Sequence, residues 1–196
     1  MAVAERRLVA RAFFQRDPLE CARELIGTML VWGQCSGVVV EVEAYLTEND
    51  EACHTFNRPS TRAFVERNKA GAAYIYLNYG VHWMLNVLVK GAPQTGLILI
   101  RAIEPRDGIG VMRKRRGVED VRQLCSGPGK LTQALGITMR HHELDLCADP
   151  RHCFAEKERD EYNVVADARI GITRSAHLPW RFTLRGSPFV SRPPKL

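Results

Sequence analysis

Five stretches with the composition of β-strands follow one another through short turns, and this succession constrains the fold more than any other feature. They are residues 28–32, 38–46, 72–77, 81–90 and 95–105. Each run is rich in β-branched or aromatic residues and is bounded by glycine or polar residues, which predicts strands. Consecutive strands joined by short connections favour an antiparallel sheet, with hairpins across residues 33–37 and 78–80. We therefore expect one α+β domain spanning residues 1–196.

Helices are expected to pack against this sheet. In residues 16–27, Asp17 is placed to cap a helix, Pro18 to take its first position and Gly27 to end it. Residues 107–117, 118–124 and 130–135 also have helical patterns, whereas residues 161–173 and 179–191 return to the pattern of strands. The segment between Leu46 and Ala72 is interpreted as a polar loop.

The charge of the chain favours a polyanionic partner. The formal net charge is +6 over 196 residues, and a basic excess of this kind suits nucleic acid. No apolar run is long enough to span a bilayer, and the N-terminal stretch lacks the apolar core of a signal peptide. We expect no membrane association and an intracellular location, in a bacterial cytoplasm or nucleoid or in a nucleus. Six cysteines without a C-x-x-C pair are expected to be free thiols.

The strand at residues 38–46 has an unusual face. Side chains alternate along a strand, so Val38, Val40, Val42, Ala44 and Leu46 should share the core face, and Val39, Glu41, Glu43 and Tyr45 the other. Two carboxylates and a tyrosine then lie side by side. On the strand at residues 95–105, Arg101 shares a face with Leu97 and Leu99 and needs a partner if it is buried. Glu41 or Glu43 can supply it, and a structural ion pair explains the pattern equally well.

Aromatic side chains accompany these charges. Tyr74 and Tyr76 share a strand face, for which ordinary sheet packing is the simpler explanation. Tyr79 falls at the apex of a hairpin, where a large ring buries little area and usually contacts a partner, for example as a wedge between bases. His54 follows an acidic loop. Together, Glu43, Tyr45, His54, Tyr76 and Arg101 suit a flat base held between rings beside a water-activating group.

Two basic features are candidate phosphate contacts. Gly127 and Gly129 precede a helix start that carries Lys130 in its first turn, and free backbone N–H groups there favour an anion. The spacing is not that of a P-loop, and a plain turn and cap is an alternative. The run that includes Arg113 and Arg115 is either a solvated helix face or a second phosphate contact.

A metal site is not expected. His141, His142, Cys147, His152 and Cys153 match no zinc-ligand spacing, and the signature of zinc nucleobase deaminases is absent.

Five ordered motifs resemble those of the alkyladenine (3-methyladenine) DNA glycosylases. They are VEVEAYL followed by DEACH, YIYLNYGVHWMLNV, LIRAIEP, LCSGPGKLTQAL and RFTLRGSPFVS, and the resemblance covers roughly residues 13–191. It implies a curved antiparallel sheet, no cofactor, and a monomer acting on double-stranded DNA with damaged purines. The implied reaction is monofunctional excision of alkylated or deaminated purines, of the 3-methyladenine, hypoxanthine and ethenoadenine class, by base flipping and hydrolysis.

The resemblance also implies roles for single residues. Glu43 is similar to the family's general base and Arg101 to its partner in holding water. Tyr45 is similar to the residue that stacks on one face of the flipped base. The other face is implied for His54 and Tyr76.

Two further roles follow from the resemblance. Tyr79 is similar to the wedge in the duplex, and Asn86 to the residue that disfavours guanine's 2-amino group. The chain departs from the family pattern at residues 55–73 and at Val81, and residues 138–162 match weakly. These departures affect the expected substrate range and loop contacts more than the expected reaction. The rival hypotheses are a non-catalytic protein that binds damaged DNA or RNA on the same scaffold, and a structural-zinc module.

Overall fold

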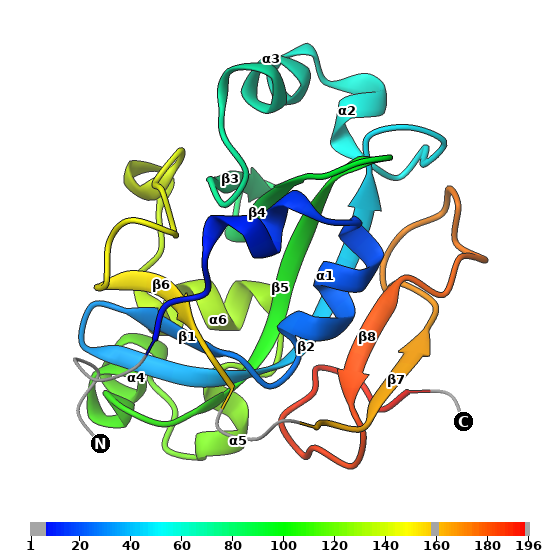
Figure 1. The fold of residues 1–196 in the computed structure, drawn as a ribbon. Coiled ribbons are helices and arrows are strands. Elements are labelled where there is room, and N and C mark those ends of the chain that lie inside the picture. Colours follow the sequence, from blue (N-terminus) through cyan, green and yellow to red (C-terminus); the bar gives the residue numbers. More distant parts are fainter. Residues whose placement is uncertain (1–6, 158–160, 195–196) are drawn as a thin grey trace.

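The strands form one eight-stranded antiparallel sheet, which curves through the molecule (Figure 1). The computed structural model describes residues 7–157 and 161–194; residues 1–6, 158–160 and 195–196 of the expected domain lie outside the described residues. The strands are β1 (Met29–Trp32), β2 (Cys35–Leu46), β3 (Ala73–Asn78), β4 (His82–Lys90), β5 (Thr95–Pro105), β6 (His152–Ala155), β7 (Val164–Asp167) and β8 (Arg181–Leu184). The predicted α+β class with a curved antiparallel sheet is confirmed.

Strand β2 is the centre of the sheet. The strand order is β3-β4-β5-β2-β1-β6, and β8 pairs with both β2 and β7. Glu43 on β2 is consequently opposite Leu99 of β5 on one side and Arg181 of β8 on the other. Three strands therefore meet around the two carboxylates of β2.

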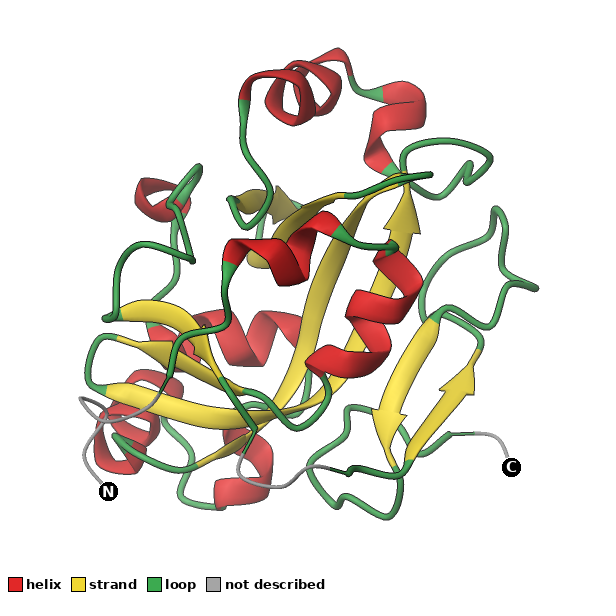
Figure 2. Cartoon of the chain, in the orientation of Figure 1, coloured by secondary structure: helices red, strands yellow, loops and turns green. Residues whose placement is uncertain are grey.

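The helices are α1 (Pro18–Leu25), α2 (His54–Asn57), α3 (Pro59–Arg67), α4 (Ile109–Arg116), α5 (Val121–Leu124) and α6 (Pro128–Leu135), with 3-10 turns at Arg11–Gln15 and Met139–His141 (Figure 2). Helix α1 begins as predicted, because Oδ1 of Asp17 accepts hydrogen bonds from the N–H groups of Leu19, at 2.8 Å, and Glu20, at 3.1 Å. Helices α4 and α5 fall within the predicted segments, and α6 begins two residues before the predicted segment 130–135 and ends with it.

The main core lies between the sheet and the helices α1 and α6. Leu25 of α1 and Leu131 of α6 pack in one buried cluster with Val42 of β2 and Ile98 and Ile100 of β5. The alternate residues of β5, including Leu97 and Leu99, face away from this cluster and line a pocket. One face of the sheet therefore stabilises the fold, and the other is available for a site.

The expected core face of β2 was wrong at its beginning. The pairing of β2 with β5 shifts on both sides of Glu41, so that Val40 on β2 and Arg101 on β5 each lack a directly opposite partner. Each extra residue reverses the alternation. Val39, rather than Val40, consequently shares the main core with Val42, while Val38 packs with Met29 and other residues of a separate small cluster. Glu41 and Glu43 still share a side.

Other segments also differ from expectation. The loop predicted between Leu46 and Ala72 contains α2 and α3, and Pro59 at the first turn of α3 was the available signal. The strands predicted at 161–173 and 179–191 shrink to the four residues of β7 and of β8. Strand β6 was not predicted. The six cysteines are free, as expected.

Candidate active site

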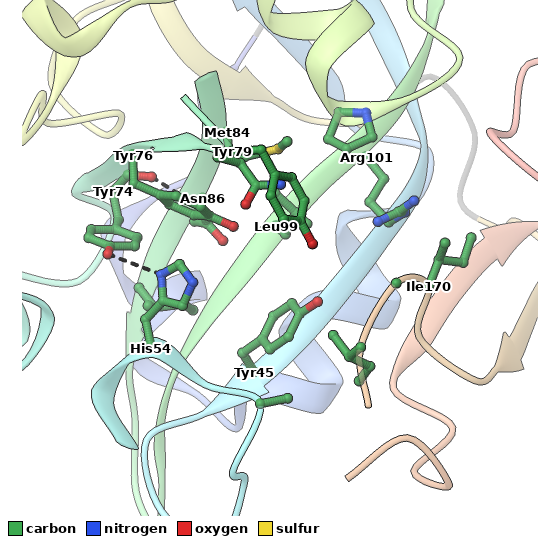
Figure 3. A pocket seen from close by; sticks show the side chains of 16 residues that line it. Tyr45, His54, Tyr74, Tyr76, Tyr79, Met84, Asn86, Leu99, Arg101 and Ile170 are labelled. Atoms are coloured by element: carbon green, nitrogen blue, oxygen red, sulfur yellow. Dashed lines mark hydrogen bonds between the residues drawn. The ribbon is translucent and has the colours of Figure 1, made fainter. Parts of the chain in front are cut away.

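A pocket of about 260 Å³ opens on the sheet face opposite the main core (Figure 3). Strands β3, β4 and β5, the start of α2 and residues 170–172 border it. The pocket brings together six of the residues singled out in the sequence: Tyr45, His54, Tyr76, Tyr79, Asn86 and Arg101. Its volume and its mixture of flat rings with a few polar groups suit one small planar ligand.

Arg101 joins the pocket to both carboxylates of β2. Its Nη1 donates to Oε2 of Glu43 at 3.2 Å, and its Nε donates to Oε1 of Glu41 at 2.9 Å. The bulge at Arg101 re-aims this side chain, as bulges beside active sites commonly do. The sequence left open whether Glu41 or Glu43 is the partner of Arg101, and in the structure Arg101 contacts both carboxylates.

Glu43 lies directly behind the pocket wall. Its side chain is fully buried, and its Oε2 also accepts from the Tyr45 hydroxyl at 2.8 Å, while Oε1 accepts from the N–H of Ile170 at 2.7 Å. All three donors, on Arg101, Tyr45 and Ile170, belong to residues that line the pocket. The carboxylate therefore contacts the lining of the pocket through each of these three residues.

Glu41 is held by groups from three segments of the chain. Its Oε1 accepts from Nε of Arg101, Nε of Arg181 and Oγ of Ser191, and its Oε2 accepts from the N–H of Ser191 at 2.5 Å. Burial raises the pKa of Glu41, but Arg101, the Ser191 amide and Arg181 outweigh it, so that the pKa is lowered. Arg181 in turn contacts Asp167 at 3.1 Å. Glu41 is thus a buried carboxylate that contacts Arg101, Arg181 and Ser191 at the same time.

Aromatic rings form the walls of the pocket. The ring centres of His54 and Tyr76 are 4.3 Å apart in an edge-to-face arrangement, and Nδ1 of His54 lies 3.3 Å from the Tyr74 hydroxyl. Figure 3 shows Tyr45 across the pocket from Tyr74 and Tyr76. The rings therefore leave a slot bounded on two sides.

The histidine and the tyrosine in the wall are uncharged near neutral pH. Burial, with the nearby Arg58 cation, lowers the pKa of His54 to about 4. Burial also raises the pKa of Tyr76 to about 12. The wall is therefore neutral, and it offers hydrogen-bonding groups without added charge.

Asn86 lies on the floor of the pocket. Its Nδ2 donates to the carbonyl of Tyr74 at 3.2 Å, and the residue is 4% exposed. This bond orients the side-chain amide on the paired strands β3 and β4.

Tyr79 occupies the tip of the β3–β4 hairpin. It is 88% exposed, with a backbone φ of 50° in the left-handed region. Its ring also contributes to the rim of the pocket. The expected apex position is confirmed.

The segment before α6 adjoins the pocket through Pro128. Gly127 has a φ of 145°, which strains any other residue, and it precedes the first turn that carries Gly129 and Lys130. The Lys130 side chain is directed along the surface, where Nζ contacts Oε1 of Gln123 at 2.8 Å. Gly127 is buried, and Gly129 and Lys130 are half-buried.

Arg113 and Arg115 are on α4, which contributes no residue to the pocket lining. Nε of Arg113 donates to the carbonyl of Glu119 at 3.0 Å, and Nη1 of Arg115 donates to the carbonyl of Ala134 at 3.0 Å. Both guanidinium groups thus already have contacts within the fold.

A second buried cation beside the pocket was missed in the sequence. Arg169 donates from Nη1 and Nη2 to the two carboxylate oxygens of Asp50 at 2.6 and 2.8 Å, and both side chains are fully buried. The next residue, Ile170, donates to Glu43. The available signal was an arginine in the strand-like run ADARIGIT, the same kind of pattern that identified Arg101.

The histidine and cysteine residues at 141–153 have structural contacts. His141 and His152 pack against Trp32 with ring centres 5.2 and 5.0 Å from it, and Nδ1 of His142 accepts from the N–H of Ile75. Across residues 7–157 and 161–194, no group of three potential ligands is arranged to hold a metal. In the same described residues, no helix has the length and apolar character needed to cross a bilayer.

Comparisons with known proteins agree on one family. A family model described as methylpurine-DNA glycosylase (MPG) matches residues 12–188. A protein of Rhodopseudomonas palustris (strain BisB18) is 49% identical over 183 residues, 93% of this chain and 90% of its own length. One of Nitrosospira multiformis is 43% identical over 180 residues, 92% of each chain. Both relatives bear the name "Putative 3-methyladenine DNA glycosylase".

Proposed function

The chain belongs to the methylpurine-DNA glycosylase family, and on that premise we propose that it is a monofunctional DNA glycosylase. It hydrolyses the N-glycosyl bond of alkylated or deaminated purines, of the 3-methyladenine, hypoxanthine and ethenoadenine class, in double-stranded DNA. The reaction initiates base excision repair. The protein acts inside the cell as a monomer, with residues 1–196 as a single glycosylase domain.

One observation carries this proposal: a carboxylate paired with a guanidinium lies immediately behind a pocket with aromatic walls. Glu43 and Arg101 contact each other at 3.2 Å, and Arg101 is exposed to the pocket that Tyr45, His54 and Tyr76 border. A base inside a duplex is out of reach for such a pocket, so the target nucleotide has to be flipped out. A protein that only binds damage has no need for the Glu43–Arg101 pair.

In the proposed reaction, a water molecule enters beside Arg101 and hydrogen-bonds to Glu43. Its oxygen attacks C1′ of the sugar, its proton passes to the Glu43 carboxylate, and the bond between C1′ and the base nitrogen breaks. The electron pair of that bond leaves with the base. The apo contacts of Glu43 with Tyr45 and Ile170 do not exclude this role, because catalytic hydrogen bonds often form only with substrate bound.

The pocket residues select the base. Tyr45 stacks on one face, and His54 with Tyr76 on the other. Asn86 opposes the 2-amino group of guanine by occupying the space that this group needs, because the hydrogen bond to the Tyr74 carbonyl fixes its side chain there. No lysine is among the described residues that line the pocket, which supports hydrolysis without lyase chemistry.

The DNA contacts surround the pocket. Tyr79 fills the gap in the duplex, and the backbone at Gly127 and Gly129, with Lys130, contacts a phosphate at the start of α6. Arg113 and Arg115 on α4 contact phosphates farther along the duplex.

The test is incubation of the protein with duplexes that carry 3-methyladenine, hypoxanthine or ethenoadenine, scored for abasic sites. Release of at least one of these bases, with an intact strand before alkali treatment, is the expected result. Strand scission without alkali would contradict the monofunctional assignment. Tight binding without base release would favour the non-catalytic alternative.

A further inference from the structure

Arg169 lies against the aromatic wall of the pocket from behind. The central guanidinium carbon of Arg169 is 4.5 Å from the ring centre of Tyr45 and 5.1 Å from that of Trp180. Its side chain is fully buried. The Tyr45 ring lines the pocket, whereas Arg169 does not. The cation therefore covers the face of Tyr45 that is turned away from the pocket.

Asp50 partly offsets this cation. Its two oxygens accept from Nη1 and Nη2 of Arg169, at the edge of the guanidinium plane. Nε of Arg169, in contrast, has no hydrogen-bond partner although it is buried. The positive member of the pair is thus the one that contacts Tyr45. No charged group other than Arg169 contacts the ring face of Tyr45 among the described residues.

We propose that Arg169 and Asp50 set the preference of the pocket between cationic and neutral damaged bases. An aromatic face attracts a cation through its negative potential, and a guanidinium on the opposite face diminishes that attraction. An N-alkylated purine such as 3-methyladenine is positively charged while it is attached to the sugar, whereas hypoxanthine is neutral. Arg169 therefore disfavours the first kind of base relative to the second. This inference rests on the proposed glycosylase function.

Two variants are expected to change the relative excision of cationic and neutral bases in opposite directions. Asp50→Asn removes the offsetting charge and leaves Arg169 more positive, so cationic bases should be excised less well relative to neutral ones. Arg169→Gln combined with Asp50→Asn removes both charges, so cationic bases should be favoured. Replacing both members of a buried pair leaves no uncompensated charge and is often tolerated. A loss of packing alone would shift both substrates, and both variants, in the same direction.

The experiment measures single-turnover excision of 3-methyladenine and of hypoxanthine from otherwise identical duplexes. Thermal unfolding of each protein accompanies it. We expect the ratio of the two rates to fall about threefold or more in Asp50→Asn and to rise by a similar factor in the double variant. An unchanged ratio in the folded double variant, or shifts of both variants in one direction, would overturn the inference.

Two further outcomes are decided by the same data. If Asp50→Asn does not fold, the ratio in the double variant alone supports or overturns the inference. If the wild-type protein releases none of the three bases 3-methyladenine, hypoxanthine and ethenoadenine, the proposed function itself fails. That outcome differs from normal excision with an unchanged ratio of the two rates, which overturns only the inference about Arg169 and Asp50.

Discussion

Oε1 of Glu41 lies 2.9 Å from Nε of Arg101, so the arginine that faces the pocket is held from behind by a carboxylate that does not face it. The same oxygen contacts Arg181 of β8 and the hydroxyl of Ser191. The orientation of Arg101 toward Glu43 therefore depends on a segment about 90 residues farther along the chain. We expect Glu41 to act as a positioning residue, whereas the sequence offered it only as one of two possible partners for Arg101.

Substitution of Glu41 tests this dependence. Glu41→Gln leaves Arg101 and Arg181 with one negative charge fewer in a buried site, and breaking a buried pair typically costs about 3–5 kcal/mol of stability. Excision should fall while binding to damaged duplex is retained, because Arg101 loses its orientation. Denaturant unfolding and single-turnover kinetics measure the two effects. Glu41→Asp keeps the charge and should restore part of the rate; equal rates for Gln and Asp would contradict a positioning role.

Glu43 is predicted to be the general base. Glu43→Gln keeps the shape of the side chain and removes its basicity, so single-turnover excision should fall by about 10²–10⁴-fold. Binding to a damaged duplex should persist or tighten, because a negative charge near the DNA is removed. Fluorescence anisotropy with a labelled duplex provides the binding measurement. Near-normal excision by Glu43→Gln would refute the assignment.

His54 provides a prediction of pH dependence. Its pKa falls from 6.5 to about 4 on folding, so between these values the unfolded chain binds a proton that the folded protein does not. Stability therefore decreases as the pH falls from 6.5 toward 4 and is fully retained above 6.5. His54→Gln removes this contribution, and its melting temperature should vary less with pH across that window than that of the wild type. Identical pH profiles would mean that His54 is protonated as easily in the folded state.

The antiparallel sheet and its two hairpins, β1–β2 and β3–β4, were predictable from the sequence because their strands are separated by short turns. The bulges at Val40 and Arg101 were not, since the pairing of β2 with β5 joins residues about 60 positions apart. They decide which valine meets the core and how Arg101 is aimed. Glu43 and Arg101 were found because they place charge on apolar strands, and Tyr45 because it shares a strand face with Glu43. Arg169 has the same signal as Arg101, an arginine in a strand-like run, but its pairing with Asp50 joins two loops 119 positions apart and has no pattern in the sequence.

Lys130 is predicted to contact a phosphate. Lys130→Ala should weaken binding to damaged and undamaged duplexes alike. The slope of log K against log salt should become shallower by about 0.9, the value for one phosphate contact. Lys130→Arg preserves the charge and should preserve the slope. If the alanine variant has the wild-type slope, the contact of Lys130 with Gln123 is its only role.

Tyr79 is predicted to be the wedge that enters the duplex. Its ring is 88% exposed at the tip of the β3–β4 hairpin and lies at the rim of the pocket that would receive the flipped base. Flipping costs a few kcal/mol of lost stacking and pairing. A ring in the vacated gap restores part of that stacking and slows the return of the base.

Tyr79→Ser should leave folding nearly intact, because an exposed ring buries little area. The substitution also leaves a residue other than glycine at the backbone φ of 50°, so the conformational cost of this position changes little. It should reduce the flipped population by about 1–3 kcal/mol, the scale of one base–aromatic stack. A fluorescent base analogue at the target site reports the stacking. The loss should be larger for a base paired in a duplex than for one opposite a gap, where extrusion is already easy. Tyr79→Trp, which keeps an aromatic ring, is the matched control; if serine flips the base as fully as tryptophan and the wild type do, Tyr79 is not the wedge.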